Sequence, residues 1–373
     1  MTLYLSSMHL YVHVPFCARR CSYCDFAIAV RRRVPGSEFV GAILGEWEGW
    51  QHHPVWDESP IVETVYFGGG TPSRLDPAGI GRMLSRFGAD RPLAPGAEVT
   101  VEANPDDVTP ESAMAWRAAG VNRVSLGVQS FDPAALAWMH RTHTAEQVPL
   151  AIESLRQADI ADLSLDLIFG LPTSVHRRWE DDLDRALALE PTHLSLYGLT
   201  VEDKTPLGRW TATGRVTPAD GERYAHEFVA AHRAILHAGY EHYEVSNAAR
   251  PGHRARHNSA YWRRAPFIGL GPSAHSGFGV SRQWNIREWQ AYYDSSQRGE
   301  SLVEGRETLD AGQVAVEEAY LGLRTLGGLA AERVSEPNRA AWTAAGWARI
   351  ENGRVILTAE GWLRLDALAG LVN

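Results

Sequence analysis

The stretch Cys17-Ala-Arg-Arg-Cys21-Ser-Tyr-Cys24 holds all three cysteines of the chain within eight residues. An odd number of cysteines so close together does not form a disulfide framework, and it indicates metal or redox chemistry in a reducing compartment. With the spacing C-x3-C-x2-C, three thiolates on one loop can each hold one iron of a cubane cluster and leave the fourth iron without a protein ligand. A zinc site is the alternative, but structural zinc takes four ligands, and only His13 is close enough in sequence to add one.

The cysteine stretch follows the first of six β-branched or apolar runs that predict strands. These runs cover residues 9–14, 61–67, 98–103, 122–128, 162–168 and 193–199. Helical segments separate them, and Thr109-Pro110-Glu111 and Asp132-Pro133 each combine an N-cap with a proline at the first helical position. Strands that alternate with helical crossovers predict an α/β fold whose parallel sheet curls toward a barrel, with sites at the C-terminal strand ends.

The rest of the chain predicts two further parts. The first contains a long amphipathic helix at 217–239, a strand at 240–246, an Arg- and His-rich loop at 250–264, a Gly-rich turn at 269–273 and a helix at 286–299. From about residue 304, short helices, a β-hairpin and a last helix from Ala359 resemble a small winged-helix module, for which a structural role is favoured over DNA binding because it has little excess basic charge. We therefore divide the chain into residues 1–215, 216–303 and 304–373.

Composition and charge disfavour several classes of protein. Of the 373 residues, 45% are apolar and 22% are charged, as in globular rather than disordered chains. The net charge of −9 disfavours non-specific binding to nucleic acid or to anionic membranes. No apolar run approaches the roughly 18 residues of a membrane span, and the N-terminus lacks the basic start and cleavage site of a signal peptide. We expect a soluble, cytoplasmic protein.

Further motifs follow the predicted strands in order. Tyr66-Phe-Gly-Gly-Gly-Thr-Pro72 comes after the second strand, and its glycines allow the backbone to approach a ligand closely. The others are Val101-Glu102-Ala-Asn-Pro105, Gly127-Val-Gln129-Ser-Phe131, His140-Arg141 and Asp166-Leu-Ile-Phe-Gly-Leu-Pro172. A single carboxylate at a strand end is more often structural than functional, but the ordered set indicates a ligand site.

Together, the cysteine spacing and these motifs resemble the oxygen-independent coproporphyrinogen III oxidase-like family of the radical S-adenosylmethionine (SAM) superfamily, over roughly residues 10–280. The resemblance implies a partial (β/α)6 barrel, a [4Fe-4S] cluster on Cys17, Cys21 and Cys24, and a SAM molecule that chelates the open iron. It implies a SAM site of Tyr11, Gly69, Gly70, Thr71 and Glu102. Positions that bind a second SAM in the oxidase branch are matched by Tyr23, Gln129, Arg141, Asp166 and Thr200. The sequence therefore leaves open whether the chain has one SAM site or two.

Two branches of this family differ in function. The oxidase branch decarboxylates propionate side chains of coproporphyrinogen III, and its motif continues to a fourth cysteine where this chain has Asp25-Phe26. That branch also has a longer N-terminal extension, whereas Tyr11 here lies ten residues from the start. The haem chaperone (HemW) branch carries H-N-x-x-Y-W, which occurs here as His257-Asn258-Ser-Ala-Tyr261-Trp262.

The resemblance therefore implies a radical-SAM-type haem chaperone that delivers haem to respiratory or other haem proteins. An imidazole can ligate haem iron, flat aromatic rings can pack on a porphyrin, and guanidinium groups suit propionates. We accordingly expect His257, Asn258, Tyr261 and Trp262 to bind haem, with His257 as the iron ligand. Because this segment is remote in sequence from the cysteines, we also expect haem binding and cluster assembly to be independent.

Two alternatives to the haem chaperone remain open. The chain could be an oxygen-independent coproporphyrinogen III dehydrogenase, or a radical SAM enzyme that acts on another substrate, so enzymatic activity is undecided. Without the motif, the segment around His257 would be interpreted as a solvated basic loop with one structural histidine. The haem acceptor is not determined, and a homodimer is compatible with the sequence. We expect no nucleic-acid partner and no transmembrane segment.

Overall fold

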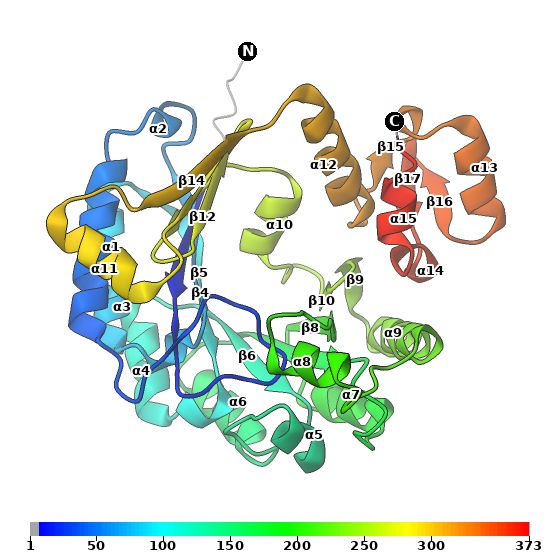
Figure 1. The fold of residues 1–373 in the computed structure, drawn as a ribbon, viewed down its shortest axis with the longest axis horizontal. Helices are drawn as coiled ribbons and strands as arrows, with labels where there is room; N and C mark the ends of the chain where they lie inside the picture. Colours follow the sequence, from blue (N-terminus) through cyan, green and yellow to red (C-terminus); the bar gives the residue numbers. More distant parts are fainter. Residues whose placement is uncertain (1–6, 373) are drawn as a thin grey trace.

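The computed structural model describes residues 7–372. Residues 1–6, which begin the segment where we expect no signal peptide, lie outside the described residues. Within 7–372, twelve strands form one sheet, and its centre consists of the six parallel strands that the sequence predicts (Figure 1). In sheet order they are β1 (Met8–Val14), β4 (Val62–Gly69), β5 (Leu93–Ala103), β6 (Arg123–Gln129), β7 (Asp162–Phe169) and β8 (His193–Gly198).

Helices cover the outer face of this partial barrel, because each parallel connection must cross back over the sheet (Figure 1). The predicted caps are confirmed: the Thr109 hydroxyl accepts from the Ser112 N–H at 3.2 Å, and the Asp132 carboxylate accepts from the Ala135 N–H at 2.8 Å. The helices of this part are α1 (Gly36–Trp50), α2 (Val55–Glu58), α3 (Pro77–Asp90), α4 (Pro110–Ala119), α5 (Pro133–Trp138), α6 (Gln147–Gln157), α7 (Trp179–Ala188), α8 (Pro206–Ala212) and α9 (Gly221–His237).

Both edges of the six-stranded core carry further strands. Beside β8 lie β10 (Asn247–Ala249) and β9 (Glu241–Glu244), which run antiparallel. Beside β1 lies the parallel strand β11 (Phe267–Leu270), followed by antiparallel β12 (His275–Phe278), β13 (Ser281–Asn285) and β14 (Val303–Thr308). Helix α11 (Trp289–Arg298) packs against α1, and the short parallel pair β2 (Phe16–Cys17) and β3 (Ala29–Val30) frames the cysteine loop.

The expected loop at 250–264 is in part a helix, α10 (Arg256–Trp262), so that expectation is wrong. The backbone N–H groups of Arg256 and His257 both donate to the carboxylate of Glu98, at 3.0 Å each. Glu98 therefore supplies the acceptors that the first turn of a helix lacks. Since this cap comes from β5, 158 residues earlier in the chain, no local sequence signal marks the start of the helix.

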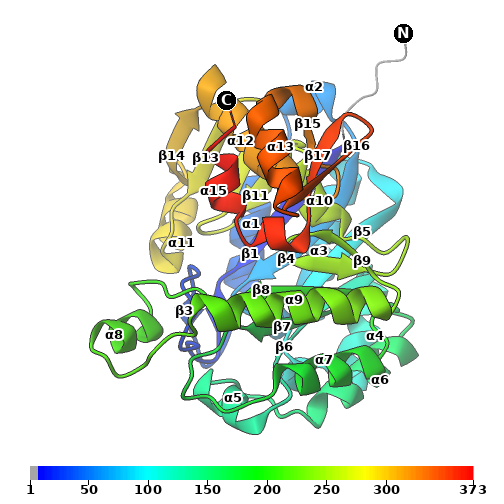
Figure 2. The same ribbon diagram turned by 90° about the vertical axis from the view of Figure 1, so that its right-hand side faces the viewer.

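The C-terminal elements follow the predicted order of helices, hairpin and helix. They are α12 (Ala311–Leu323), β15 (Leu329–Ala330), α13 (Glu336–Ala344), β16 (Ala348–Glu351), β17 (Arg354–Leu357), α14 (Ala359–Trp362) and α15 (Leu365–Ala369). The strands β15, β17 and β16 form a separate three-stranded sheet, and Figure 2 shows these C-terminal elements beside α9. The ring centroids of Trp362 and of His242 on β9 lie 4.9 Å apart, and this contact joins the C-terminal part to the larger sheet. The division at 215/216 and 303/304 stays a prediction.

The core is built from both faces of the parallel strands. β1 and β6 are buried along nearly their whole lengths, as is typical of strands covered on both sides. Within the described range, no helix combines the length and apolar character that crossing a bilayer requires.

Candidate functional site

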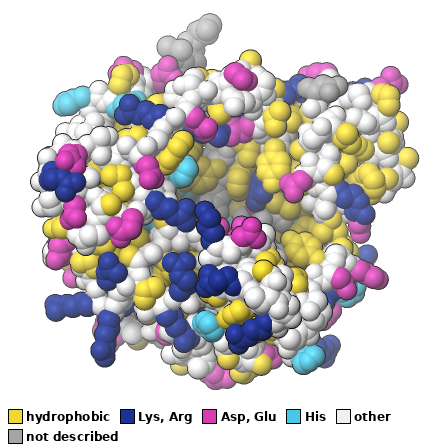
Figure 3. All heavy atoms as spheres, in the orientation of Figure 1, with side chains coloured by type: hydrophobic (Ala, Val, Ile, Leu, Met, Phe, Trp, Pro, Cys, Tyr) yellow, Lys and Arg dark blue, Asp and Glu magenta, His cyan; other side chains and the backbone are white. Residues whose placement is uncertain are grey.

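A pocket of about 420 Å³ opens where the parallel strands end, for example at Gly69 of β4 and Gln129 of β6. Sites in folds of this kind gather at that end of the sheet. The pocket brings together all three cysteines and nine of the ten residues expected to bind SAM. Those nine are Tyr23, Gly69, Gly70, Thr71, Glu102, Gln129, Arg141, Asp166 and Thr200. Figure 3 shows Lys and Arg side chains gathered on the same face of the molecule, over the segment that follows β1.

The three cysteines line the pocket as free thiols. The Thr71 hydroxyl donates to Cys17 Sγ at 3.4 Å, and Arg141 Nη1 donates to Cys21 Sγ at 3.8 Å. Burial raises the pKa of Cys17 and raises that of Cys24 to about 11. The described residues hold no group of three ligands around a single metal ion. Each thiolate of a cubane cluster ligates a different iron, so three thiols that line one pocket fit such a cluster.

The Gly-rich turn after β4 has no room for side chains. Gly69 has φ +114°, and a Cβ there would lie 2.6 Å from the His13 ring. A Cβ on Gly70 would lie 2.7 Å from the Pro15 carbonyl group and 3.0 Å from Cys17 Sγ. The glycines therefore let this backbone pass directly against the cysteine loop. The close approach to a ligand that the motif predicts stays a prediction.

Glu102, at the end of β5, is fixed by the same turn. Its Oε2 accepts from the Gly69 N–H at 3.0 Å, and its Oε1 accepts from the Tyr66 hydroxyl at 2.8 Å. Burial raises the pKa of Glu102 to about 7. A carboxylate held in this way can accept hydrogen bonds from an ammonium group or a ribose hydroxyl in the pocket.

Asp166 on β7 is the second carboxylate of the pocket. The Ser125 hydroxyl donates to both of its oxygens, at 2.9 and 3.0 Å, and the Ser164 hydroxyl donates at 3.3 Å. Burial raises the pKa of Asp166 to about 6. Neither serine stands in one of the quoted motifs. Strand register is the signal for Ser125, which pairs with Ser164 across β6 and β7. Ser164 itself lies two residues before Asp166 and so faces the same side of β7.

Arg141 joins the cysteine loop to the strand ends. Its Nη2 donates to the Gly127 carbonyl at 2.9 Å and to Asn104 Oδ1 at 2.5 Å. Its Nε is buried and has no hydrogen-bond partner among the described residues. A buried guanidinium N–H without an acceptor costs free energy, and a ligand can remove that cost. Arg141 therefore fits a pocket that receives an anionic or acceptor group. Asn104 was not singled out before, although it lies inside the quoted 101–105 motif.

Tyr11 is the one expected SAM residue that does not line the pocket. Its hydroxyl lies 3.0 Å from His13 Nδ1, and its ring stacks on Tyr66 with centroids 6.1 Å apart. It therefore supports the pocket floor through Tyr66 in this structure.

The H-N-x-x-Y-W residues lie on α10, and none of them lines the cysteine pocket. The His257 side chain is buried, with Nδ1 at 2.6 Å from Thr64 Oγ1 and Nε2 at 2.8 Å from the Tyr261 hydroxyl. Burial lowers the pKa of His257 well below its usual value. Asn258 is half-buried, and Tyr261 and Trp262 line a different groove. His257 therefore contacts Tyr261 but does not line the groove that Tyr261 and Trp262 line.

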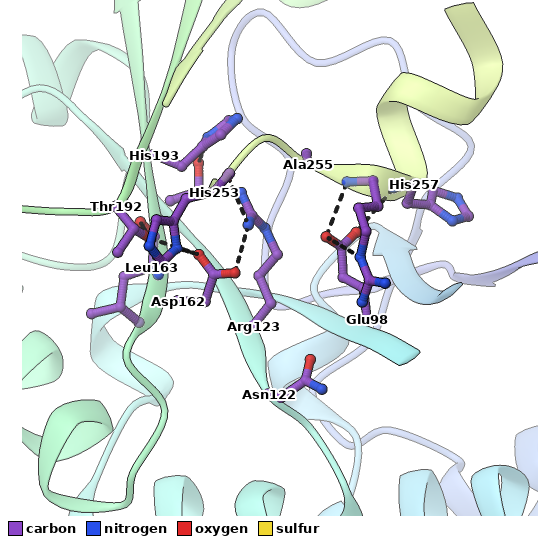
Figure 4. A network of polar contacts seen from close by, with 12 residues as sticks. Glu98, Asn122, Arg123, Asp162, Leu163, Thr192, His193, His253, Ala255 and His257 are labelled. Atoms are coloured by element: carbon purple, nitrogen blue, oxygen red, sulfur yellow. Dashed lines mark hydrogen bonds and ion pairs between the residues drawn. The ribbon is translucent and has the colours of Figure 1, made fainter. Parts of the chain in front are cut away.

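A polar network around the buried Arg123 holds the segment before α10 against the N-terminal strand ends (Figure 4). Arg123, the first residue of β6, forms an ion pair with Asp162 of β7 at 2.9 Å, and its Nη1 donates to the His253 carbonyl at 3.3 Å. The His253 ring in turn contacts Asp162 at 3.4 Å. This network anchors the segment that leads into α10 at the end of the strands opposite the cysteine pocket.

The comparisons with known proteins agree with this geometry. Residues 11–186 match the model of the Radical SAM superfamily. The chain is 37% identical over 296 residues to the heme chaperone HemW of Synechocystis sp., covering 78% of this chain and 71% of the relative. It is 35% identical over 362 residues to HemW of Mycobacterium tuberculosis, covering 96% and 93%. The structure of coproporphyrinogen III oxidase (HemN) from Escherichia coli shares the fold, with a TM-score of 0.81, 20% identity, and coverage of 99% of this chain and 91% of that one.

The fold and the three-cysteine pocket define a radical SAM protein. At 35–37% identity over most of its length, the chain belongs to the HemW heme chaperone family.

Proposed function

We propose that this protein is a haem chaperone that holds a [4Fe-4S] cluster and SAM in the cysteine pocket and delivers haem to acceptor proteins. The proposed binding of the cluster and SAM rests on one observation: three free thiols and nine expected SAM residues line the same pocket. The proposed binding and delivery of haem is supported by the relatives named heme chaperones and by the H-N-x-x-Y-W residues, which lie on a separate helix.

The cysteines and the expected SAM residues have the following roles in this proposal. Cys17, Cys21 and Cys24 hold the cluster, which supplies an electron to SAM when both are bound. The backbone of Gly69 and Gly70 passes close to the ligand because these residues carry no side chains. Glu102 accepts from the amino end of SAM, and the Arg141 guanidinium offers its unpaired Nε–H to an acceptor group.

The other expected SAM residues complete the proposed cradle. Asp166 accepts from ribose hydroxyls, while Tyr23, Thr71, Gln129 and Thr200 line the walls and Tyr11 supports Tyr66 from below. Gln129 has φ +65°, a costly backbone conformation for a residue with a side chain, and such strain is typical of ligand sites.

An oxygen-independent coproporphyrinogen III dehydrogenase is the second candidate, since HemN shares the fold. The chain lacks the fourth cysteine that the oxidase branch carries after Cys24, and Asp25-Phe26 stands in its place. This difference favours the chaperone. In this proposal the haem acceptors are haem proteins such as respiratory ones. The protein acts in the cytoplasm. A homodimer fits a carrier that docks on several partners.

Parallel assays on one anaerobically reconstituted sample test the proposal. Haem is titrated in while the Soret band is followed, and a second aliquot receives coproporphyrinogen III, SAM and reductant. We expect saturable haem uptake, transfer of that haem to an added apo-haem protein, and no consumption of the porphyrinogen. Turnover of the porphyrinogen would establish the dehydrogenase instead. A protein that takes up no haem would be a radical SAM enzyme with another substrate.

A further inference from the structure

A second groove, of about 280 Å³, lies between α10, β12 and α12. Tyr261 and Trp262 line it from α10, and its other apolar walls are Phe267, Phe278 and Leu321. The flat aromatic half of the H-N-x-x-Y-W segment therefore faces this groove, while His257 points into the barrel.

His257 is poorly placed to ligate an iron in this groove. Its side chain is 1% exposed, and both ring nitrogens lie within hydrogen-bond distance of hydroxyl groups, those of Thr64 and Tyr261. A neutral imidazole has a single acceptor nitrogen, and here that nitrogen is already engaged. Ligation would require breaking a buried hydrogen bond and moving the ring away from Tyr66, on which it stacks at 5.0 Å.

A second histidine, His275, lines the groove. It is exposed, it lines the groove from β12, and among residues 7–372 its ring nitrogens have no hydrogen-bond partner. Its ring stacks on Trp284 of β13, with centroids 5.8 Å apart and an interplanar angle of 28°, which fixes the direction of the imidazole.

The face of β12 that carries His275 continues into an aromatic wall. His275 and Gly277 are two residues apart on β12, so they face the same side of the sheet. Gly277 has no side chain, and a Cβ there would lie 2.7 Å from the Phe267 ring. Phe267 in turn packs edge-on against Tyr261 at 4.7 Å. An imidazole, an aromatic wall and the motif tyrosine thus follow one another along one face.

Two guanidinium groups lie at the same groove. Arg264 and Arg282 both line it, and both pair with the carboxylate of Glu317, Arg264 Nε at 2.8 Å. A propionate entering the groove can replace Glu317 at either arginine, because carboxylates bind guanidinium groups in the same geometry.

We propose that haem binds in this groove and that His275, rather than His257, is the residue that ligates the iron. The inference rests on the proposed haem chaperone function. His257 is then a positioning residue, which holds Tyr261 through its hydrogen bond. Sites that enclose a ligand usually measure about 300–1,000 Å³, so a groove of 280 Å³ leaves part of the macrocycle outside. A partly exposed haem suits a protein that must pass it on.

The test compares single variants of the full-length, cluster-loaded protein: His275→Ala, His275→Met, His257→Ala and, as a matched control, the exposed His176→Ala. Haem affinity is measured by Soret titration, and the iron ligand by low-temperature EPR and resonance Raman spectroscopy. We expect His275→Ala to lose the histidine-ligated spectrum and to bind haem at least tenfold more weakly. Added imidazole should restore that spectrum, and His275→Met should shift it to a thioether-ligated form.

We expect His176→Ala to match the wild type. His257→Ala should keep the histidine-ligated spectrum, although its affinity falls if α10 loosens. A wild-type spectrum and affinity in His275→Ala would overturn the inference while leaving the chaperone function intact. Loss of the ligand signature in His257→Ala alone would overturn it in favour of His257. Absence of haem binding by the wild type would instead refute the proposed function.

Discussion

The imidazole of His257 stacks on the phenol ring of Tyr66, with centroids 5.0 Å apart and an interplanar angle of 24°. The Tyr66 hydroxyl donates to Glu102, which lines the cysteine pocket. The H-N-x-x-Y-W helix therefore lies directly beneath the proposed SAM site. Distance along the sequence was the reason to expect the two sites to be independent, and this contact removes that reason.

The first prediction concerns the cysteines. Replacing Cys17, Cys21 or Cys24 by Ala should abolish the broad visible absorption of the reconstituted protein, because each thiolate holds a different iron. Iron and sulfide analysis of the wild type should give about four of each per chain. A single variant that keeps full iron content and absorption would contradict the assignment of that cysteine.

The second prediction concerns the Gly-rich turn. Gly70→Ala should lower both cluster content and SAM affinity, because the new Cβ meets the Pro15 backbone and Cys17 Sγ. Gly45→Ala on α1 is the matched control, since a Cβ there has nothing within 4 Å. Iron analysis and equilibrium dialysis with SAM measure the two effects. Equal behaviour of the two variants would show that the turn is not pressed against the cysteine loop.

The third prediction concerns Glu102. Glu102→Gln removes a charged acceptor but keeps the side-chain shape, so SAM affinity should fall by about 1.5–3 kcal/mol, or roughly tenfold to a hundredfold. Cluster absorption should be unchanged. Calorimetric titration with SAM measures the loss. Tyr66→Phe, which removes one hydrogen bond to Glu102 and keeps the stacked ring, should have a smaller effect. Unaltered SAM affinity in Glu102→Gln would remove this carboxylate from the site.

The fourth prediction concerns the cap of α10. Glu98→Ala should reduce the free energy of unfolding by about 1–3 kcal/mol, because two buried backbone N–H groups lose their acceptor. Hydrogen exchange in residues 256–262 should accelerate, and haem affinity should fall with it. Glu153→Ala, an exposed change on α6, is the control. If exchange in 256–262 stays slow, Glu98 is not what holds the helix.

The fifth prediction concerns pH and Glu46 on α1. Its carboxylate accepts from the Gly271 N–H at 2.7 Å and from the Tyr292 hydroxyl at 2.6 Å, and burial raises its pKa to about 7. Because the pKa in the folded state lies above the unfolded value of 4.5, this group stabilises the fold fully below about pH 4.5. That contribution is lost as the pH rises to 7, by on the order of 3 kcal/mol.

Urea unfolding of the wild type, Glu46→Gln and the exposed Glu48→Gln between pH 5 and 8 measures this effect. Glu46→Gln should flatten the decline in the free energy of unfolding with pH, whereas Glu48→Gln should follow the wild type. Identical slopes in all three proteins would contradict the buried state of Glu46.

Much of the fold is predictable because its signals are local. Apolar runs mark the six parallel strands, and Thr109 and Asp132 mark helix starts within a few residues of the groups they cap. The cofactor pocket is predictable for a related reason. Motifs that follow parallel strands must meet at one edge of the sheet, and nine of ten expected SAM residues line that pocket.

The exceptions depend on contacts between distant parts of the chain. Tyr11 lies one layer below the pocket because its ring packs on Tyr66 of the neighbouring strand. Ser125 meets Asp166 only through the register of β6 and β7, whereas Ser164 lies two residues before Asp166 on the same strand. Neither the Tyr11 contact nor the Ser125 contact has a signature in the residues that flank it.

The sequence by itself determined the cysteine motif, the order of strands and helices, and the family resemblance, because thiol spacing and hydrophobic periodicity are properties of adjacent residues. Only the tertiary structure decided that 256–262 is a helix, that its imidazole is buried against Tyr66, and that His275 faces the groove of Tyr261 and Trp262. The physical reason is that hydrogen-bond acceptors and burial come from neighbours in space. Glu98 and Thr64, which fix His257, lie 159 and 193 residues away from it along the chain.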